Sequence, residues 1–162
     1  MKKYSIIIVL FVFAASFWNC EKDDICEDGT ITTPQLVVEF YDATDNTLVK
    51  QVPSIAYFEN SVSDTIKKTA VSKIYIPLKT NEDTVTFKMI LNGADNDNSD
   101  DVEDSVTINY SRKDIYISRA CDYKTNFTIS DFIVNSTNWI ANSTIEQTNV
   151  TNENEIHVKI YF

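Results

Sequence analysis

The chain has 162 residues, of which 14 are basic and 24 are acidic, giving a net charge of −10. This acidity argues against nucleic-acid binding and against a polybasic membrane patch, because both need positive surface charge. Hydrophobic residues make up 43% of the chain and aromatic residues 12%, which is ample for a folded core. We therefore expect a folded protein rather than a disordered one.

Residues 1–19 have the three parts of a secretory signal: a basic start, an apolar stretch from Ile6 to Trp18 and a processing site before Cys20. The apolar stretch is shorter than the roughly 20 residues that a membrane-spanning helix needs. We expect a lipoprotein signal peptide with Cys20 as the lipid acceptor, and the alternative is a retained transmembrane anchor. Phe17-Trp18-Asn19 departs from a standard lipobox, which has an aliphatic residue followed by two small ones.

The acidic run Cys20-Glu21-Lys22-Asp23-Asp24 resembles the export signal that sends some Bacteroidota lipoproteins to the outer face of the outer membrane. We expect residues 20–33 to be a lipidated acidic tether and the protein to be displayed on the cell surface. Only the lipid should then attach the protein to the membrane. The alternative is a plain charged tether on a lipoprotein that faces the periplasm.

The three cysteines fit one lipid acceptor and one pair. If Cys20 is acylated, Cys26 and Cys121 remain in an oxidising compartment, where a disulfide is the expected state. The bridge would close a loop of about 95 residues, for which the chain-entropy model gives about 4–5 kcal/mol of stabilisation. Two buried free thiols are the alternative.

From Leu36 onward, apolar and polar residues alternate with the period of two that is typical of strands with one buried face. The pattern predicts strands within residues 36–41, 73–78, 84–91, 106–110, 115–121, 127–134, 139–140 and 156–162. The polar run Ser111-Arg112-Lys113-Asp114 is interpreted as a hairpin turn. Roughly eight short strands favour an all-β fold with one domain over residues 34–162: an antiparallel β-sandwich of Greek-key, immunoglobulin-like type rather than a barrel.

An acidic loop that begins at Asp95 is the one candidate for a metal site. Asp95, Asp97 and Ser99 fall at positions one, three and five of an EF-hand-like loop, and Asp101 adds a further carboxylate. Position six is not glycine and position twelve is not glutamate. A solvated hairpin tip is the alternative, and we expect no metal and no cofactor.

The single histidine, His157, is expected on the solvent face of the last strand beside Lys159 and Tyr161. A zinc site or a Ser-His-Asp arrangement would need partners that converge on it. Paired carboxylates of the glycosidase kind could meet in an acidic protein, but a small sandwich with short loops offers little room for a cleft. The sequence therefore predicts a protein that is not an enzyme.

Four tyrosines, Tyr41, Tyr75, Tyr116 and Tyr161, fall on the outward phase of their predicted strands. Exposed aromatic rings can stack on sugars or anchor a partner protein. Alternatively, both faces of these strands are partly buried, or the tyrosines stabilise the sheet through cross-strand contacts.

Thr65, Thr84 and Ser105 occupy the centre of Asp-Ser/Thr-aliphatic tripeptides, which look like the O-glycosylation acceptors of Bacteroidota. Each tripeptide also lies where a turn should pass into a strand, and that position gives the same residues without a glycan.

Several stretches together resemble an uncharacterised family of small Bacteroidota lipoproteins, a domain of unknown function. They are Cys20-Glu21-Lys22-Asp23-Asp24-Ile25-Cys26, Thr32-Thr33-Pro34, Phe40-Tyr41-Asp42, Ile76-Pro77-Leu78 and Ser118-Arg119-Ala120-Cys121. The resemblance implies a common fold and location, but no activity and no catalytic residues, and it strengthens the proposed cysteine pair.

We expect a non-catalytic module that is lipid-anchored at the outer membrane and binds an envelope protein or a glycan, with no nucleic-acid partner. The alternatives are a structural accessory subunit of an outer-membrane complex and, third, a small carboxylate-based hydrolase.

Overall fold

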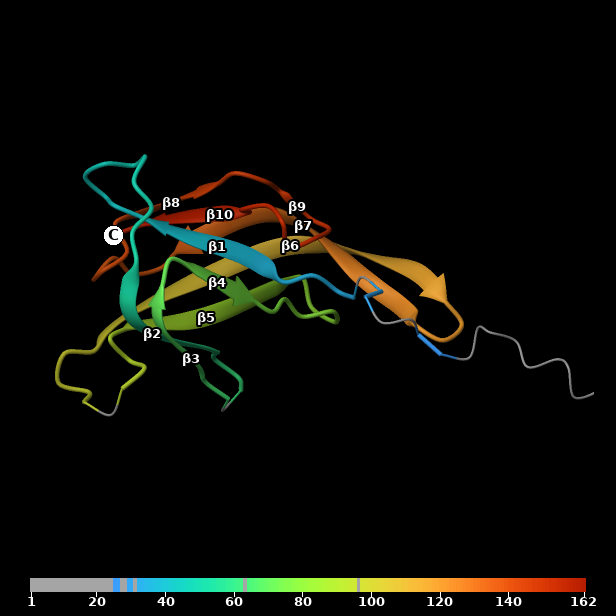
Figure 1. Ribbon diagram of the computed structural model, residues 1–162, viewed down its shortest axis with the longest axis horizontal. Helices are drawn as coiled ribbons and strands as arrows, with labels where there is room; N and C mark the ends of the chain where they lie inside the picture. The colour runs from blue at the N-terminus through green and yellow to red at the C-terminus, as the bar shows by residue number, and fades with distance from the viewer. Residues whose placement is uncertain (1–24, 27–28, 31, 63, 96) are drawn as a thin grey trace, which may run out of the picture. The chain divides into compact units, whose positions relative to one another are not determined.

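The computed structural model describes most of the chain (Figure 1): residues 25–26, 29–30, 32–62, 64–95 and 97–162. The predicted signal peptide of residues 1–19, the acceptor Cys20 and the export signal from Glu21 to Asp24 lie outside these residues. Within the described ranges, no helix has the length and the apolar character needed to cross a membrane.

The chain divides into two compact units. Among the described residues, 25–26, 29–30 and 116–123 belong to the smaller unit, and 32–62, 64–95, 97–115 and 124–162 form the larger one. The strands are β1 (Leu36–Tyr41), β2 (Val52–Glu59), β3 (Ile66–Val71), β4 (Lys73–Ile76), β5 (Thr84–Leu91), β6 (Val102–Ser118), β7 (Asp122–Val134), β8 (Asn142–Ile145), β9 (Asn149–Val150) and β10 (Val158–Tyr161).

The strands of the larger unit form a four-stranded sheet in the order β4-β1-β10-β8 and a six-stranded sheet in the order β3-β2-β5-β6-β7-β9. The predicted all-β sandwich is thus confirmed. One pair departs from the expected antiparallel pattern, because β1 and β10 run parallel, with Val38 opposite Val158. A parallel pair needs a long connection, and here the rest of the sandwich supplies it.

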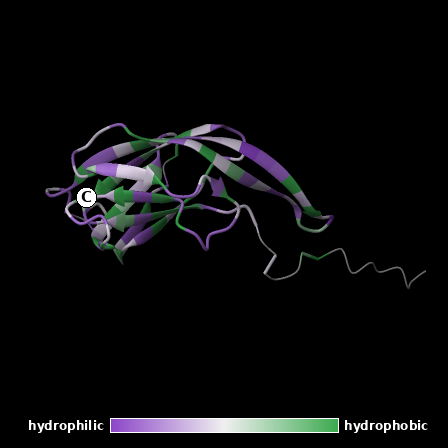
Figure 2. Ribbon diagram, turned by 90° about the horizontal axis from the view of Figure 1, so that it is seen from above, coloured by the Kyte–Doolittle hydropathy of each residue, from purple (hydrophilic) through white to green (hydrophobic). Residues whose placement is uncertain are grey.

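The core lies between the two sheets and follows the predicted alternation. Leu36, Val38 and Phe40 of β1 are fully buried, as is Met89 of β5. Figure 2 shows the alternation as bands of opposite hydropathy along the strands. Burial of each such side chain stabilises the fold by about 1.5–3 kcal/mol, so the alternating positions contribute strongly to the stability of the sandwich.

The predicted hairpin turn at Ser111 to Asp114 is wrong. Strand β6 runs through this segment to Ser118, and the chain turns over residues 119–121 instead. The polar side chains find partners in neighbouring segments: Arg112 Nε donates to Asp83 Oδ1 at 2.7 Å, and Asp114 Oδ1 accepts a hydrogen bond from Thr125 Oγ1 at 2.7 Å. The strand can therefore continue through a polar run.

Asp104 is a fully buried charged residue of β6. Its carboxylate accepts hydrogen bonds from the backbone N–H groups of Asn138, Trp139 and Ile140, each at 2.8 Å. The predicted strand at residues 139–140 is instead a loop that this carboxylate holds. Burial alone would raise the pKa of Asp104, but the three N–H donors hold it below its usual value.

The loop carries Trp139 into the core. The indole N–H donates to the carbonyl of Met89 at 3.2 Å, and the ring lies against Phe40 and Phe162 at centroid distances of 6.3 and 5.7 Å. Since Phe40 belongs to the four-stranded sheet and Met89 to the other, Trp139 joins the two layers.

Asp104→Asn should lower the free energy of unfolding by about 3 kcal/mol, because an amide has one acceptor oxygen for three donors and loses the charge that strengthens the bonds. Urea denaturation followed by tryptophan fluorescence measures the change. The matched control is Asp100→Asn in the exposed loop before β6, with an expected change within about 0.5 kcal/mol. Equal stability of the two variants would contradict the role of Asp104.

His157 is fully buried, which corrects its expected position on a solvent face. It precedes β10 and extends the contact of that strand with β1: its backbone N–H donates to the carbonyl of Val37, and its Nδ1 accepts the N–H of Val37, both at 3.0 Å. The proton of the neutral ring is therefore on Nε2, which has no hydrogen-bond partner among the described residues. Protonation of Nδ1 would break the bond to Val37.

The imidazole of His157 should titrate with a midpoint below 6.5 in the folded protein, because burial lowers its pKa more than Glu155 and Glu153 raise it. The unfolded chain takes up the proton at higher pH than the folded protein. The contribution of His157 to the free energy of unfolding is therefore fully present above pH 6.5 and falls as the pH drops towards the folded-state pKa. One-histidine NMR titration measures the midpoint directly. His157→Asn keeps an acceptor but cannot titrate, and it should remove this part of the pH dependence; a midpoint above 6.5 would contradict the prediction.

Candidate binding cleft

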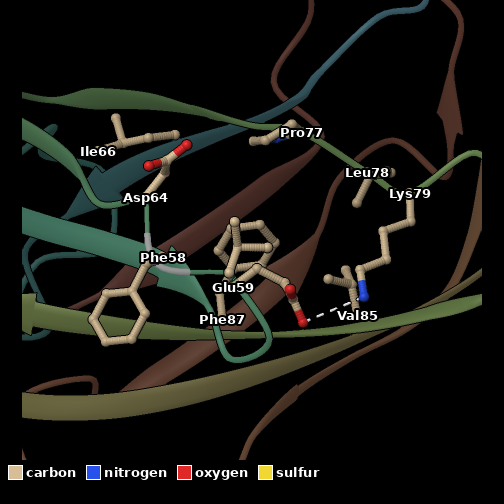
Figure 3. A pocket seen from close by; sticks show the side chains of 10 residues that line it. Phe58, Glu59, Asp64, Ile66, Pro77, Leu78, Lys79, Val85 and Phe87 are labelled. Atoms are coloured by element: carbon tan, nitrogen blue, oxygen red, sulfur yellow. Dashed lines mark ion pairs between the residues drawn. The ribbon is translucent and has the colours of Figure 1, made fainter.

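A cleft of about 250 Å³ opens in the larger unit (Figure 3). Its floor is formed by Val85 and Phe87, which are nearly buried core residues of β5. The complete lining comprises Phe58, Glu59, Val62, Asp64, Ile66, Pro77, Leu78, Lys79, Val85 and Phe87. Seven of the ten side chains are apolar, so the cleft is an opening to the hydrophobic core with a polar rim.

The cleft lies where two edge strands belong to different sheets. Strand β3 is the outer strand of the six-stranded sheet, and β4 is the outer strand of the four-stranded one. The chain passes from one sheet to the other at Ser72, whose carbonyl accepts the N–H of Phe40 at 2.9 Å. Because β3 and β4 do not pair with one another, backbone hydrogen bonds do not close the edge between them.

Tyr110 fixes one wall of the cleft. Its hydroxyl accepts the backbone N–H of Lys79 at 3.0 Å and donates to the carbonyl of the same residue at 3.1 Å. The ring of Tyr110 packs edge-on against Phe127 with a centroid distance of 5.4 Å. Burial raises the pKa of Tyr110, so the hydroxyl remains protonated and able to donate.

The rim carries a small charge network. Lys79 Nζ lies 3.4 Å from a carboxylate oxygen of Glu59 and 3.2 Å from one of Glu82. The hydroxyl of Ser61 donates to Glu59 and, as the largest cause, lowers the pKa of that carboxyl. Partial burial by itself lowers the pKa of Lys79, but the hydrogen bonds to Glu82 and Glu59 and the attraction of their charges raise this pKa overall. Glu59 and Lys79 therefore stay ionised at neutral pH.

The dimensions and lining limit what the cleft can hold. Sites for small-molecule ligands usually have volumes of about 300–1,000 Å³, so a 250 Å³ cleft fits a single apolar group better than a whole ligand. The floor residues Val85 and Phe87 are uncharged. The charged lining residues Glu59, Asp64 and Lys79 can contact polar atoms that lie beside a bound apolar group.

The cleft was not foreseen from the sequence, because two strands that build it were not predicted. Strand β2 contains the continuous apolar run from Ile55 to Phe58, and β3 is mostly exposed. A continuous apolar run bounded by turns is typical of a strand buried on both faces, and this signal could have identified β2.

The calcium candidates are placed in the loop between β5 and β6. Asp95 Oδ1 accepts the N–H of Asp97, and Asp97 Oδ1 accepts the N–H of Ser99, so these carboxylates stabilise successive turns. Asp101 has a buried oxygen without a hydrogen-bond partner among the described residues. In the described part of the chain, no three His, Cys, Asp or Glu side chains are grouped to hold a metal ion.

The three tripeptide hydroxyls differ in accessibility. Thr65 and Thr84 are exposed, and Thr84 Oγ1 donates to Asn109 Oδ1 at 2.8 Å. Ser105 is half-buried, and its backbone N–H donates to Ser136 Oγ at 3.1 Å. Thr65 and Thr84 are therefore accessible to a modifying enzyme, whereas Ser105 is partly covered.

The four tyrosines separate into two kinds. Tyr161 is buried, contacts Tyr41 with a ring-centroid distance of 5.9 Å, and stabilises the outer face of the four-stranded sheet. A hydrogen bond to Glu39 is the largest cause that raises the pKa of Tyr41 to about 12. Tyr75 and Tyr116 are exposed, as the sequence predicted.

The smaller unit contains the cysteine pair. Cys26 and Cys121 form a disulfide with a Cα–Cα distance of 4.9 Å, which is the pairing expected from the sequence. The backbone N–H of Cys121 donates to Ser118 Oγ at 3.0 Å, so this hydrogen bond holds the turn after β6 in addition to the disulfide.

A family model with the description "Family of unknown function (DUF6452)" matches the chain over residues 54–162. The match includes every residue that lines the cleft. The domain of unknown function implied by the sequence resemblance is thereby confirmed over this range. No curated protein and no solved structure matches the chain.

Proposed function

The chain belongs to DUF6452, a family of unknown function, and we propose that it is a lipid-anchored protein of the bacterial cell envelope that binds an apolar side chain of a partner protein in its cleft. The observation that carries this proposal is an opening of about 250 Å³ whose floor is the hydrophobic core and whose rim holds Glu59 and Lys79 as a fixed ion pair.

A protein partner suits the cleft better than a glycan. Interfaces are anchored by a few large apolar or aromatic side chains that fill pockets of this kind, with polar contacts around them. The hydroxyl groups of a sugar would lose hydrogen bonds to water over the floor of Val85 and Phe87, and this costs free energy. The ion pair of Glu59 and Lys79 can instead pair with polar atoms that flank an apolar anchor.

Binding is also favoured over hydrolysis. A carboxylate-based hydrolase needs one carboxyl group whose pKa is raised, so that it holds a proton at neutral pH. The carboxyl groups of the described residues with clearly shifted pKa values, including Glu59 at the cleft, are all shifted downwards. An ionised Glu59 that is paired with Lys79 is suited to orient a partner.

The sequence supports the location. Cys20 follows a secretory leader and precedes the acidic run from Glu21 to Asp24, as in the Bacteroidota lipoproteins that the chain resembles. The Cys26–Cys121 disulfide fits an oxidising compartment. We place the protein at the outer membrane and on the cell surface, with a periplasmic orientation as the alternative outcome of the test below.

Toluene, the analogue of a phenylalanine side chain, should shift the methyl NMR signals of Val85 and Leu78 in a saturable way, because both line the cleft. The methyl signals of Leu48, which is 56% exposed and does not line the cleft, provide the control within the same spectrum. Val62→Trp should block the cleft mouth and weaken the response, whereas Leu48→Trp should leave it unchanged.

Methyl β-glucoside serves as the glycan probe under the same conditions. A stronger response of Val85 and Leu78 to the glucoside than to toluene would favour a glycan ligand. Absence of saturable shifts with both probes would contradict the proposed binding site.

Cys20→Ala should abolish incorporation of labelled palmitate and release the protein from the membrane fraction, because the lipid is proposed as its attachment. Cys26→Ala is the matched control and should keep the label.

Proteinase K added to intact cells should remove peptides from residues 35–162 while periplasmic proteins stay intact. Protection until the outer membrane is broken would indicate the periplasmic orientation, and palmitate labelling of Cys20→Ala would contradict the anchor.

A further inference from the structure

The smaller unit exposes aromatic and apolar side chains close to its disulfide. Tyr116 and Tyr123 lie in T-shaped contact, with ring centroids 5.3 Å apart, and are 57% and 60% exposed. Ile25, next to Cys26, is 80% exposed. The two exposed tyrosines together present an apolar ring surface and two polar hydroxyl groups. Such a pair suits a boundary between an apolar and a polar environment.

The covalent structure places these side chains near the proposed lipid. Cys26 follows Cys20 by six residues, which reach about 20 Å at full extension. The disulfide then holds Cys121 within 4.9 Å of Cys26, measured between Cα atoms. Tyr123 is two residues from Cys121, so the tyrosine pair cannot move far from the acyl chains attached to Cys20.

We propose that Tyr116, Tyr123 and Ile25 form a membrane-docking surface that rests in the interfacial layer of the bilayer carrying the lipid anchor. Tyrosine is enriched at this layer, because its ring enters the apolar side while its hydroxyl remains with headgroups and water. The inference rests on the proposed lipidation of Cys20. Docking would fix the orientation of the smaller unit on the membrane, which attachment through the lipid alone does not.

The negative charge of the chain favours docking on a lipid surface without net negative charge. The acidic residues from Glu21 to Asp24 repel anionic headgroups, and the chain as a whole has a net charge of −10. Docking must therefore come from the aromatic and apolar side chains, and it should occur on zwitterionic phosphatidylcholine without dependence on salt.

The test uses the full lipidated protein in phosphatidylcholine vesicles that contain brominated lipids, which quench nearby tryptophan. Tyr116→Trp should lose emission on brominated vesicles and show a blue shift. The control is Tyr75→Trp, at an exposed position of β4 in the larger unit, which should show neither change. Buried Trp139 gives the background of the unsubstituted protein, and Tyr123→Trp provides a second, independent reporter.

Flotation of the unsubstituted protein separates the two ways to fail. If it does not float with the vesicles, the lipid anchor is wrong and the docking proposal is overturned with it. If it floats but Tyr116→Trp and Tyr123→Trp are quenched no more than Tyr75→Trp, the anchor stands and docking is overturned, and the tyrosine pair is then free for a protein partner. Quenching of both reporters above the control, unchanged in high salt, is the expected result.

Discussion

The sandwich depends on one buried charge, the carboxylate of Asp104. Burial of a carboxylate is costly, and here three backbone N–H groups offset the cost so fully that the pKa of Asp104 lies below its usual value. The loop that donates these bonds delivers Trp139 to the core, where its indole N–H binds Met89 and its ring packs on Phe40. Trp139 thus joins the two sheets, and the carboxylate of Asp104 sets the position of Trp139.

Period-two alternation predicted the strands with one buried face, such as β1 and β5, because water on the other face selects polar residues there. It missed β2, since the run from Ile55 to Phe58 is apolar without interruption. It also placed a turn at Ser111 to Asp114, where the strand continues because Asp83 and Thr125 supply partners from elsewhere in the fold. Such partners are remote in sequence, so a local pattern cannot reveal them.

The same limit of local sequence patterns explains which site residues could be predicted and which could not. The cysteine pair follows from counting, because Cys26 and Cys121 remain once Cys20 is assigned to the lipid, and the structure contains that disulfide. His157 looked exposed because it shares the outward phase of the last strand with Lys159 and Tyr161, yet it is buried and bonded to Val37, which is far away in sequence. The cleft likewise arises only after β3 and β4 have entered different sheets. Its lining residues share no spacing that the sequence could show.

The edges beside the cleft indicate how a partner can enter. An exposed sheet edge can add a strand from another chain, and lysine or proline at the edge opposes this. Strand β3 carries Lys67 and Lys68 and departs from regular strand geometry at Ala70, where φ is 53°. Strand β4 is followed at once by Pro77, which has no backbone N–H to donate. Both edges thus disfavour strand addition, and the opening between them leaves insertion of a side chain as the mode of contact that this corner of the sandwich permits.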